Sequence, residues 1–421
     1  MGALVQTVDI EVGLSGGSDV FPDVLSVVDC EVERVFGGGG SQATIQVVFD
    51  DLLNAQQISA FRAGVDGGAD DPFFTPKEEI ELTVDVTVTD LSPSTTETVS
   101  RRIFTGTVVR VIESHKRIVT LEALDYRHQL NKSMVRLDTT EDGAPTPEIV
   151  RNILTGEGSV GDGMGLVEGQ DFFIDMGDLD PNTRVNESWG VESHATAFTV
   201  LQELAYEEAA TLHIDRYNNV YFTKFPEHSR YSPEQMPPIV EWESGDEETS
   251  EDVIVESEYD ETGIGIYAPT SSKPNRDSPP GDRQVGEEIH QNNVFERQAI
   301  EKVRASEEVD ISLKQNSGVI RCVGDPRIDP YDMFEMNGEV IDGFSPISTG
   351  EYMAKTVRHQ INNQDGYIVE IELGRDPEEL FKEFTGRASR VVFDNWAEET
   401  KKKEEEGDQE GGFWSFIPGV N

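Results

Sequence analysis

Two stretches decide how this sequence folds: Phe104-Thr105-Gly106-Thr107-Val108-Val109-Arg110-Val111 and Val119-Thr120-Leu121-Glu122-Ala123-Leu124-Asp125. Both largely alternate apolar and polar residues with a period of two, which is typical of a strand with one buried face. The polar segment Glu113-Ser114-His115-Lys116 lies between them and predicts a turn. We therefore expect an antiparallel hairpin over residues 104–125.

The same alternation extends back toward the N-terminus. It occurs over Val8–Val12, Ala43–Phe49 and Ile80–Val88, and Gly37–Gly40 predicts a flexible turn between the first strands. Many short strands with Gly-, Pro- and Asp-rich connections favour a β-barrel or a β-sandwich.

A second group of strand patterns occupies about residues 240–376. Its clearest members are Gly318–Val323, Met333–Met336, Tyr352–Ile361 and Gly366–Leu373. The last two predict a hairpin similar to that at 104–125, which hints at a duplicated β domain. Residues 269–284 are polar and Pro-rich and predict a flexible loop.

The segment between the two β regions has a different pattern. Residues 145–154 predict a short helix with Thr146 as N-cap and Pro147 at the first position. A second helix is expected over Thr196–Ala209, where apolar residues recur at helical spacing. A hairpin then follows around Asn218-Asn219, a favourable turn pair. These elements predict a small α/β module.

The charge balance is acidic along the whole chain. The 421 residues contain 34 Lys+Arg against 82 Asp+Glu, a formal net charge of −48. Such self-repulsion is tolerable at about 1 M salt, where screening acts over a few ångströms. Because the strand patterns argue against disorder, we expect folded domains with acidic surfaces in a haloarchaeal-type, halophilic environment. Nucleic acid is disfavoured as a main ligand, since phosphate binding needs clustered Lys and Arg.

Motifs for catalysis or cofactor binding are weak. The G-x-G-x-x-G at Gly156–Gly161 follows a predicted helix instead of a strand, so we interpret it as a loop. No H-E-x-x-H zinc motif occurs. Asp175, Asp178 and Asp180 lack the Gly and the distal Glu of a calcium loop. We expect no catalytic, cofactor-binding or metal-binding residues and no enzymatic activity.

Two further features concern burial and targeting. Cys30 and Cys322 are the only cysteines, and their wide separation predicts two small buried residues. The chain has no apolar run of about 18 residues and no signal-like N-terminus, so neither a membrane span nor a secretory signal is expected.

The C-terminal region combines a charged segment with an aromatic end. Lys401–Glu406 predicts a solvated helix. A polar and Gly-rich spacer separates it from Phe413, Trp414, Phe416 and Ile417. Exposed aromatic residues are typical anchors of protein interfaces, so we expect these four to bind a partner. The alternative is that they fold back onto their own domain.

The order of these parts resembles the baseplate hub proteins of tailed phages and viruses, a family that includes the base of type VI secretion spikes. Residues 27–34 and 43–47 resemble its opening strand pair, and 104–111 with 119–125 resemble the hairpin ending its first tube-like barrel. Residues 196–205, 212–215 and 220–222 resemble its helix-plus-hairpin module.

The resemblance continues in the second β region. Gly324–Asp332 is similar to the Gly-x-Pro-x-hydrophobic-x-Pro-Gly-Asp turn of the second barrel, although Tyr331 stands where a glycine is usual. Residues 352–359 and 366–373 resemble the closing hairpin, so the resemblance covers about residues 5–376.

From these observations we expect a mainly β protein with two tube-protein-like β-barrel domains, an inserted α/β domain and a C-terminal helix. The expected domains are a first barrel at 1–130, the α/β domain at 131–235, a second barrel at 236–376 and the charged helix with the aromatic tail at 377–421.

The resemblance implies a structural hub at the tail tip or baseplate of a virion infecting a halophilic archaeon. Such a hub is a homotrimer that joins the sixfold tail tube to a threefold tip and forms part of the central channel. Its partners are tail tube or distal tail proteins, tip or fibre proteins, the tape-measure protein, and DNA in transit. The alternatives are a tail-associated cell-envelope hydrolase and a haloarchaeal surface adhesin.

Overall fold

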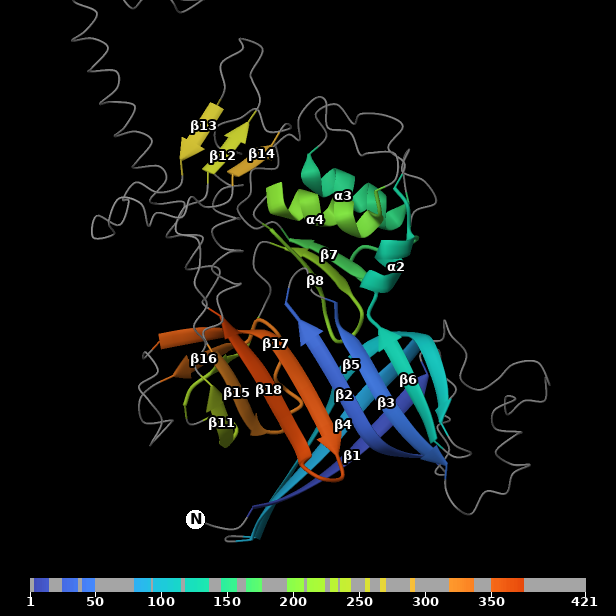
Figure 1. Cartoon of the computed structure of the whole chain (residues 1–421), viewed down its shortest axis with the longest axis vertical. Helices are drawn as coiled ribbons and strands as arrows, with labels where there is room; N and C mark the ends of the chain where they lie inside the picture. Colours follow the sequence, from blue (N-terminus) through green and yellow to red (C-terminus); the bar gives the residue numbers. More distant parts are fainter. Residues whose placement is uncertain are drawn as a thin grey trace, which may run out of the picture. The chain divides into compact units, whose positions relative to one another are not determined.

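The computed structural model describes the chain in segments (Figure 1). These are residues 4–14, 25–36, 40–49, 79–91, 94–114, 118–135, 145–156, 164–175, 195–207, 210–223, 228–233, 235–243, 254–257, 266–269, 288–291, 318–336 and 350–374. The chain divides into two compact units. The first comprises residues 1–206, 210–247 and 313–376, and the second comprises 207–209, 248–312 and 377–421.

The first unit is dominated by one 12-stranded, almost entirely antiparallel sheet. Along its main path the strands lie in the order β1-β4-β5-β6-β3-β2-β17-β18-β15-β11, and β16 pairs with β17 and β10. The mainly β class expected from the sequence is therefore confirmed. The strands of the first β region are β1 (Leu4–Leu14), β2 (Leu25–Val35), β3 (Gln42–Phe49), β4 (Glu79–Leu91), β5 (Ser94–Ser114) and β6 (Ile118–Leu124). Those of the second are β10 (Arg230–Tyr231), β11 (Ile239–Glu243), β15 (Gly318–Val323), β16 (Met333–Met336), β17 (Gly350–Asn362) and β18 (Gly366–Gly374).

Both predicted hairpins are present, as β5–β6 and β17–β18. The two β regions are joined directly, because β2 pairs antiparallel with β17 from Asp29 opposite Asn362 to Val35 opposite Thr356. They also share one hydrophobic core. Ile45, Leu82 and Leu121 come from the first region, and Ile320, Val357 and Ile371 from the second; all are fully buried.

The two β regions repeat one strand plan. In the first half, which we define as β2–β6, the spatial order is β4-β5-β6-β3-β2. In the second half, defined as β11 and β15–β18, it is β16-β17-β18-β15-β11. Taken in chain order, β2 corresponds to β11, β3 to β15, β4 to β16, β5 to β17 and β6 to β18. Every corresponding pair of neighbours is antiparallel.

Irregularities in the strand pairing recur at the same places. A bulge between Val108 and Arg110 interrupts β5–β6, and a bulge between Ala354 and Thr356 interrupts β17–β18. A second bulge lies between Val27 and Asp29 in β2, and its counterpart lies between Ile239 and Glu241 in β11. Because a bulge fixes which residues face the core, these shared bulges give a residue-by-residue correspondence between the halves.

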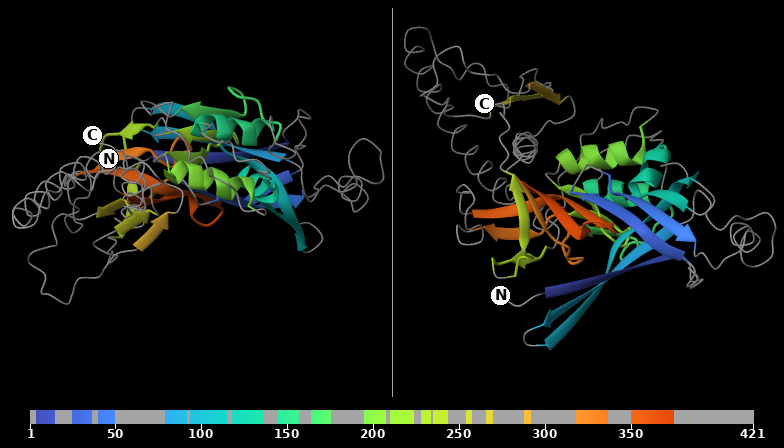
Figure 2. Two further views of the ribbon diagram at one scale, coloured as in Figure 1. Left: turned by 90° about the horizontal axis from the view of Figure 1, so that it is seen from above. Right: turned by 60° about the horizontal axis from the view of Figure 1, so that its bottom comes forward.

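The β4–β5 hairpin is much longer than the described part of its counterpart, because β4 pairs with β5 over Glu79–Leu91 and β16 pairs with β17 only over Met333–Met336. Together with β1, the hairpin projects away from the other strands of the sheet (cyan and dark blue in Figure 2). β1 pairs with β4 along its whole length, from Leu4 opposite Asp90 to Leu14 opposite Ile80. The Gln6 side chain donates a hydrogen bond to the Gly324 carbonyl at 2.9 Å, so β1 contacts the second half as well.

The α/β module lies beside the large sheet in the same unit. It contains α2 (Arg127–Lys132), α3 (Thr146–Thr155), α4 (Ala197–Glu207) and the sheet β7-β9-β8. The strands are β7 (Phe172–Asp175), β8 (Thr211–Ile214) and β9 (Val220–Thr223). Figure 1 shows α3 and α4 stacked over this small sheet. Their apolar faces bury Ile149, Val150, Leu201 and Leu204 against Phe222. Each such side chain contributes roughly 1.5–3 kcal/mol.

The helix starts differ in part from expectation. The Thr199 amide donates to the Thr196 hydroxyl at 3.2 Å, so Thr196 caps α4. The N-cap prediction for α3 is wrong, because Pro145 occupies the cap position and Thr146 is already helical and buried. Burying Thr146 in the first turn moves the helix start one residue toward the N-terminus. No helix of the described segments is long and apolar enough to cross a membrane.

The second unit contains a separate three-stranded sheet in the order β13-β12-β14. Its strands are β12 (Ile254–Ser257), β13 (Ile266–Pro269) and β14 (Glu288–Gln291). The predicted loop beyond Pro269 and the predicted helix after residue 376 lie outside the described residues.

Candidate functional site: a buried arginine junction

The tip of the β8–β9 hairpin is a rigid turn built around Asp215. Its carboxylate accepts hydrogen bonds from the amides of Tyr217 at 2.8 Å and Asn219 at 2.9 Å, and from the Tyr221 hydroxyl at 3.3 Å. Asn218 adopts a left-handed φ of 71°, which asparagine tolerates better than most residues. The turn predicted at Asn218-Asn219 is therefore confirmed, and its geometry holds Arg216 in a fixed direction.

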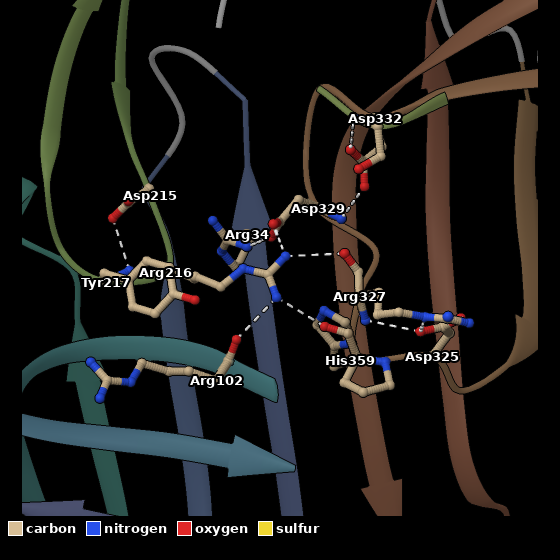
Figure 3. Close-up of polar contacts among 12 residues, drawn as sticks. Arg34, Arg102, Asp215, Arg216, Tyr217, Asp325, Arg327, Asp329, Asp332 and His359 are labelled. Atoms are coloured by element: carbon tan, nitrogen blue, oxygen red, sulfur yellow. Dashed lines mark hydrogen bonds and ion pairs between the residues drawn. The ribbon is translucent and has the colours of Figure 1, made fainter. Parts of the chain in front are cut away.

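Arg216 reaches from this tip into the large sheet (Figure 3). Its guanidinium donates to the backbone carbonyls of Arg102 at 3.1 Å, Pro326 at 3.0 Å and Arg327 at 3.0 Å. Arg102 lies on β5 in the first half, while Pro326 and Arg327 lie in the loop after β15 in the second half. One buried side chain of the α/β module thus binds both halves of the sheet.

Asp329 completes the junction. It forms ion pairs with Arg216 and with Arg34 of β2, and both arginine side chains are almost completely buried. Burial and the nearby Arg101 lower the pKa of Arg216, although an arginine stays protonated at any physiological pH. A carboxylate shared by two buried guanidiniums needs all three partners, since removing one leaves a buried charge uncompensated.

The loop that carries Asp329 is held by its own carboxylates. Asp325 accepts the Arg327 amide at 2.9 Å and forms a two-pronged ion pair with the Arg327 side chain. Asp332 accepts the amides of Ser229 at 2.8 Å and Asp329 at 2.7 Å. Burial raises the pKa of Asp332 to about 7. The loop therefore presents its carbonyls and Asp329 to Arg216 in one defined conformation.

Tyr331 occupies the position in this loop where the resembled family has a glycine. Its φ is 78°, in the left-handed region that glycine adopts without strain and that costs other residues roughly 1–2 kcal/mol. The side chain is buried, stacks on Phe36 with ring centroids 4.9 Å apart, and meets the edge of His228 at 5.0 Å. Packing against the end of β2 thus offsets the backbone strain.

A second contact between module and sheet lies beside the first. The Tyr126 amide donates to the Asn218 side chain at 2.7 Å, and Asn218 in turn donates to Glu79 on β4 at 3.3 Å. Asp125, at the end of β6, accepts the Ser41 amide at 2.9 Å. The hairpin tip is therefore fixed to β4 and to the start of α2 as well as to β5.

Two histidines near the junction, His213 and His359, are buried and neutral. Burial, and then the charge of Arg127, lower the pKa of His213 to about 4. Burial, and then Arg216, lower that of His359 to about 3, and the His359 ring bonds the Tyr367 hydroxyl at 2.8 Å. Their burial fits a structural role better than acid–base catalysis.

Some of the other sequence predictions can be compared with the structure, and the rest concern residues outside the described ones. Cys30 and Cys322 are buried free cysteines, as predicted, and burial raises the pKa of each thiol to about 12. Gly156 ends α3 with a φ of 77°, and the rest of its G-x-G-x-x-G lies outside the described residues. No cluster of metal-ligand side chains occurs in the described segments. The predicted partner-binding residues Phe413, Trp414, Phe416 and Ile417 also lie outside them.

The junction residues Arg34, Arg216 and Asp329 were not predicted from the sequence. A signal for Arg34 exists, because it continues the inward-facing series Cys30 and Val32 at a period of two. An arginine at a core position of a strand indicates a buried ionic partner.

The fold is shared with solved tail proteins. No protein-family model matches the sequence, and no curated protein does so. The tail protein of Neisseria meningitidis MC58 has a TM-score of 0.57 at 11% identity, with 90% of this chain and 99% of that one covered. The 43 kDa tail protein of prophage MuSo2 from Shewanella oneidensis has a TM-score of 0.54 at 13% identity, covering 89% and 98%. A chain of the Francisella PdpA-VgrG complex has a TM-score of 0.50 at 8% identity, covering 88% and 53%. The chain therefore has the fold of phage tail proteins.

Proposed function

We propose that this chain is the structural hub of a viral tail baseplate or tail tip and has no catalytic activity. In this proposal it is a homotrimeric adaptor that joins a sixfold tail tube to a threefold tip. The observation that carries the proposal is the internal duplication, with five strands in the same order and bulges at the same two places. Three copies of a chain with two equivalent halves supply six quasi-equivalent units.

In this proposal each predicted domain has its own role. The β domains at 1–130 and 236–376 would be the two tube-like units, although their described strands form one sheet with one core. The α/β domain at 131–235 would hold them at a fixed angle through Arg216, whose partners lie on both halves. A rigid joint suits an adaptor between two symmetries, because the relative orientation of the halves sets the geometry of the ring.

We further propose that the polar face of the sheet lines the central channel. We call the pairing of β2 with β17 the seam between the halves. Near this seam, carboxylates outnumber arginines on the polar face. They are Asp29, Glu31, Glu33, Glu241, Glu243, Glu370 and Glu372, against Arg321 and Arg358. Such a wall repels DNA phosphates and favours the passage of DNA over its retention. A basic lumen would contradict this part of the proposal.

The proposed surroundings follow from the same role. Tail tube or distal tail proteins would lie on one side of the ring, and tip or fibre proteins on the other. The tape-measure protein, and later the genome, would occupy the channel. The charge of −48 favours a halophilic archaeal virus. Phe413, Trp414, Phe416 and Ile417 would bind a neighbouring protein, and truncation at Gly407 should abolish that binding while leaving the fold intact.

The decisive experiment is to measure the mass of the purified chain in about 2 M KCl, combined with electron microscopy of the same sample. We expect about three times 46.7 kDa and rings with six similar lobes around a central hole. Monomers that hydrolyse cell-envelope material would overturn the proposal in favour of the hydrolase alternative. Monomers that bind intact cells would favour the adhesin.

A further inference from the structure

The start of the α/β module holds a buried arginine outside the junction. Arg127 is the first residue of α2, and its side chain is almost completely buried. Its guanidinium lies over the Phe198 ring of α4, 5.2 Å from the ring centroid. An arginine is always charged in a protein and carries five N–H donors in one plane, so a buried arginine needs hydrogen-bond acceptors around its edge.

The carboxylate that pairs with Arg127 does not satisfy these donors. Oδ2 of Asp125 lies 3.7 Å from Nη2 of Arg127, which is beyond hydrogen-bonding distance. Oδ1 of Asp125 accepts the Arg127 amide at 3.1 Å, and Oδ2 accepts the Ser41 amide at 2.9 Å. In the part of the chain that the structure describes, the buried Nε and Nη1 of Arg127 have no hydrogen-bond partner. Asp125 therefore offsets the charge of Arg127 but leaves two of its nitrogens without an acceptor.

A second buried side chain near Arg127 has a nitrogen in the same situation. His213 of β8 is 9% exposed, and its Nδ1 is buried without a hydrogen-bond partner among the described residues. Burial, and then the charge of Arg127, lower the pKa of His213, so the two side chains are close enough to interact electrostatically. In the tautomer that carries its proton on Nδ1, the neutral ring is a further donor. Buried nitrogens from two elements thus require an acceptor.

We propose that Arg127 and His213 bind a chloride ion. Chloride is a small, spherical ion that only accepts hydrogen bonds, as these nitrogens require, and a buried donor without an acceptor is costly. A water molecule in the same place would also have to donate its protons, while both oxygens of Asp125 already accept backbone amides. Both side chains are shielded from solvent, which favours a small ion over phosphate or a carboxylate.

A chloride site has a consequence that general salt effects do not have, and this consequence does not depend on the proposed assembly. An ion that binds only the folded chain stabilises it by mass action, up to saturation of the site. Screening of the −48 charge depends instead on the ionic strength, whichever anion supplies it. Chloride binding therefore makes the Tm depend on the identity of the anion at constant ionic strength.

The test is thermal unfolding of the full chain at about 2 M potassium, with glutamate replaced stepwise by chloride. Arg127→Met removes the site and reports the general effect of the exchange. We expect chloride to raise the Tm of the parent chain by about 2 °C relative to this variant, with half of the rise at about 0.1 M chloride. Arg151→Met, which removes an exposed arginine paired with Glu168, should behave like the parent chain. His213→Phe keeps a ring beside Phe36 but removes Nδ1, so half of the rise should need about tenfold more chloride.

Bromide identifies the bound species directly, because its anomalous X-ray scattering distinguishes it from water. In crystals of the parent chain grown with KBr, we expect an anomalous peak in contact with Arg127, and no such peak in crystals of Arg127→Met. The inference is wrong if the Tm values of the parent chain and of Arg127→Met respond equally to chloride, or if the density beside Arg127 gives no bromide signal. If Arg127→Met does not fold, His213→Phe decides, since an unchanged chloride midpoint in that variant rejects the site.

Discussion

β5 and β17 occupy equivalent places in the two halves, yet they pack through different side chains. β5 carries Phe104-Thr105-Gly106, and the corresponding stretch of β17 is Gly350-Glu351-Tyr352. The aromatic residue and the glycine have exchanged places. A Cβ on Gly106 would lie 2.4 Å from the Phe104 ring, so this ring packs directly over the glycine.

The comparison shows that the strand plan is shared at the level of backbone pairing, while the side chains have changed independently. The bulges, which fix the register, coincide in both halves. The side chains that join the halves do not correspond. The second half carries Arg358 and the loop with Asp329 and two of the carbonyls that Arg216 binds, whereas the first half supplies Arg34 and the Arg102 carbonyl. The halves are therefore equivalent as scaffolds and different as partners.

The largest expected effect comes from separating the halves at the junction. Arg216→Met leaves three backbone carbonyls and part of the Asp329 charge without their partner, and should lower the free energy of unfolding by about 3–5 kcal/mol. Arg216→Lys should recover only part of this, because a lysine lacks the planar fork. Urea unfolding in concentrated KCl measures both.

The matched control for the junction is Arg151→Met. Arg151 also pairs with a carboxylate, Glu168, at 2.7 and 3.0 Å, but this pair lies on the surface. Its loss should cost less than about 1 kcal/mol. Equal losses for Arg216→Met and Arg151→Met would show that the junction does not hold the halves together.

The second effect tests the exchanged aromatic residue. Gly106→Ala brings the new methyl group within 2.4 Å of the Phe104 ring and 2.6 Å of the Leu124 carbonyl oxygen. The ring can turn but the backbone oxygen cannot, so we expect a loss of about 3 kcal/mol, at the upper end for overpacking. Thermal unfolding measures the change. Gly13→Ala, whose methyl group meets only Glu81 at 4.0 Å, should be nearly neutral.

Much of the strand plan could be predicted from sequence, for a physical reason. In a strand with one buried face, apolar and polar residues alternate with a period of two, as in β4, β6 and β18. β11 was missed because Glu241 and Glu243 face away from the core of an already acidic segment. Helix α2 was missed because six residues are too few to show a helical period.

The contacts of the arginine junction could not be predicted from such patterns. Arg216 binds backbone carbonyls, which leave no trace in residue types, and its partners lie more than 100 positions away in the sequence. The β2–β17 seam joins residues over 320 positions apart, and alternation alone does not say which strands are neighbours. Tyr331 was noticed as a departure from a glycine pattern, but only its φ of 78° shows that the backbone kept the glycine conformation.

The third effect is a pH dependence of stability, and it comes from a histidine that only the second half has at this position. His359 of β17 corresponds to Glu113 of β5, and burial lowers the pKa of His359 to about 3 from about 6.5. Since the unfolded chain takes up the proton first, the stability contributed above about pH 6.5 is lost as the pH falls toward 3. Between pH 7 and pH 5 this amounts to about 2 kcal/mol.

His359→Gln removes this titration while keeping a polar partner for Tyr367. The variant should therefore lose about 2 kcal/mol less than the parent chain between pH 7 and pH 5, as measured by urea unfolding at each pH. His213, whose pKa is lowered to about 4, should account for a similar loss that remains in the variant. If the variant and the parent chain lose the same stability, His359 is not the group that titrates.

The smallest effect tests the seam itself by making the second half resemble the first. Arg358 is 24% exposed, and its Nε donates to Glu33 at 3.0 Å across the β2–β17 seam. Arg358→Ile installs the residue found at the corresponding position of β5, Ile112, and should cost about 1 kcal/mol at low salt, since the ion pairs are partly solvated.

Arg110→Ile is the control: Arg110 is 64% exposed and lies 3.4 Å from Glu122 within the first half, so its loss should be close to zero. The difference between the two variants should shrink as KCl is raised, because salt screens exposed charges more than buried ones. If the loss for Arg358→Ile equals that of the control, or does not change with salt, backbone pairing alone holds the seam.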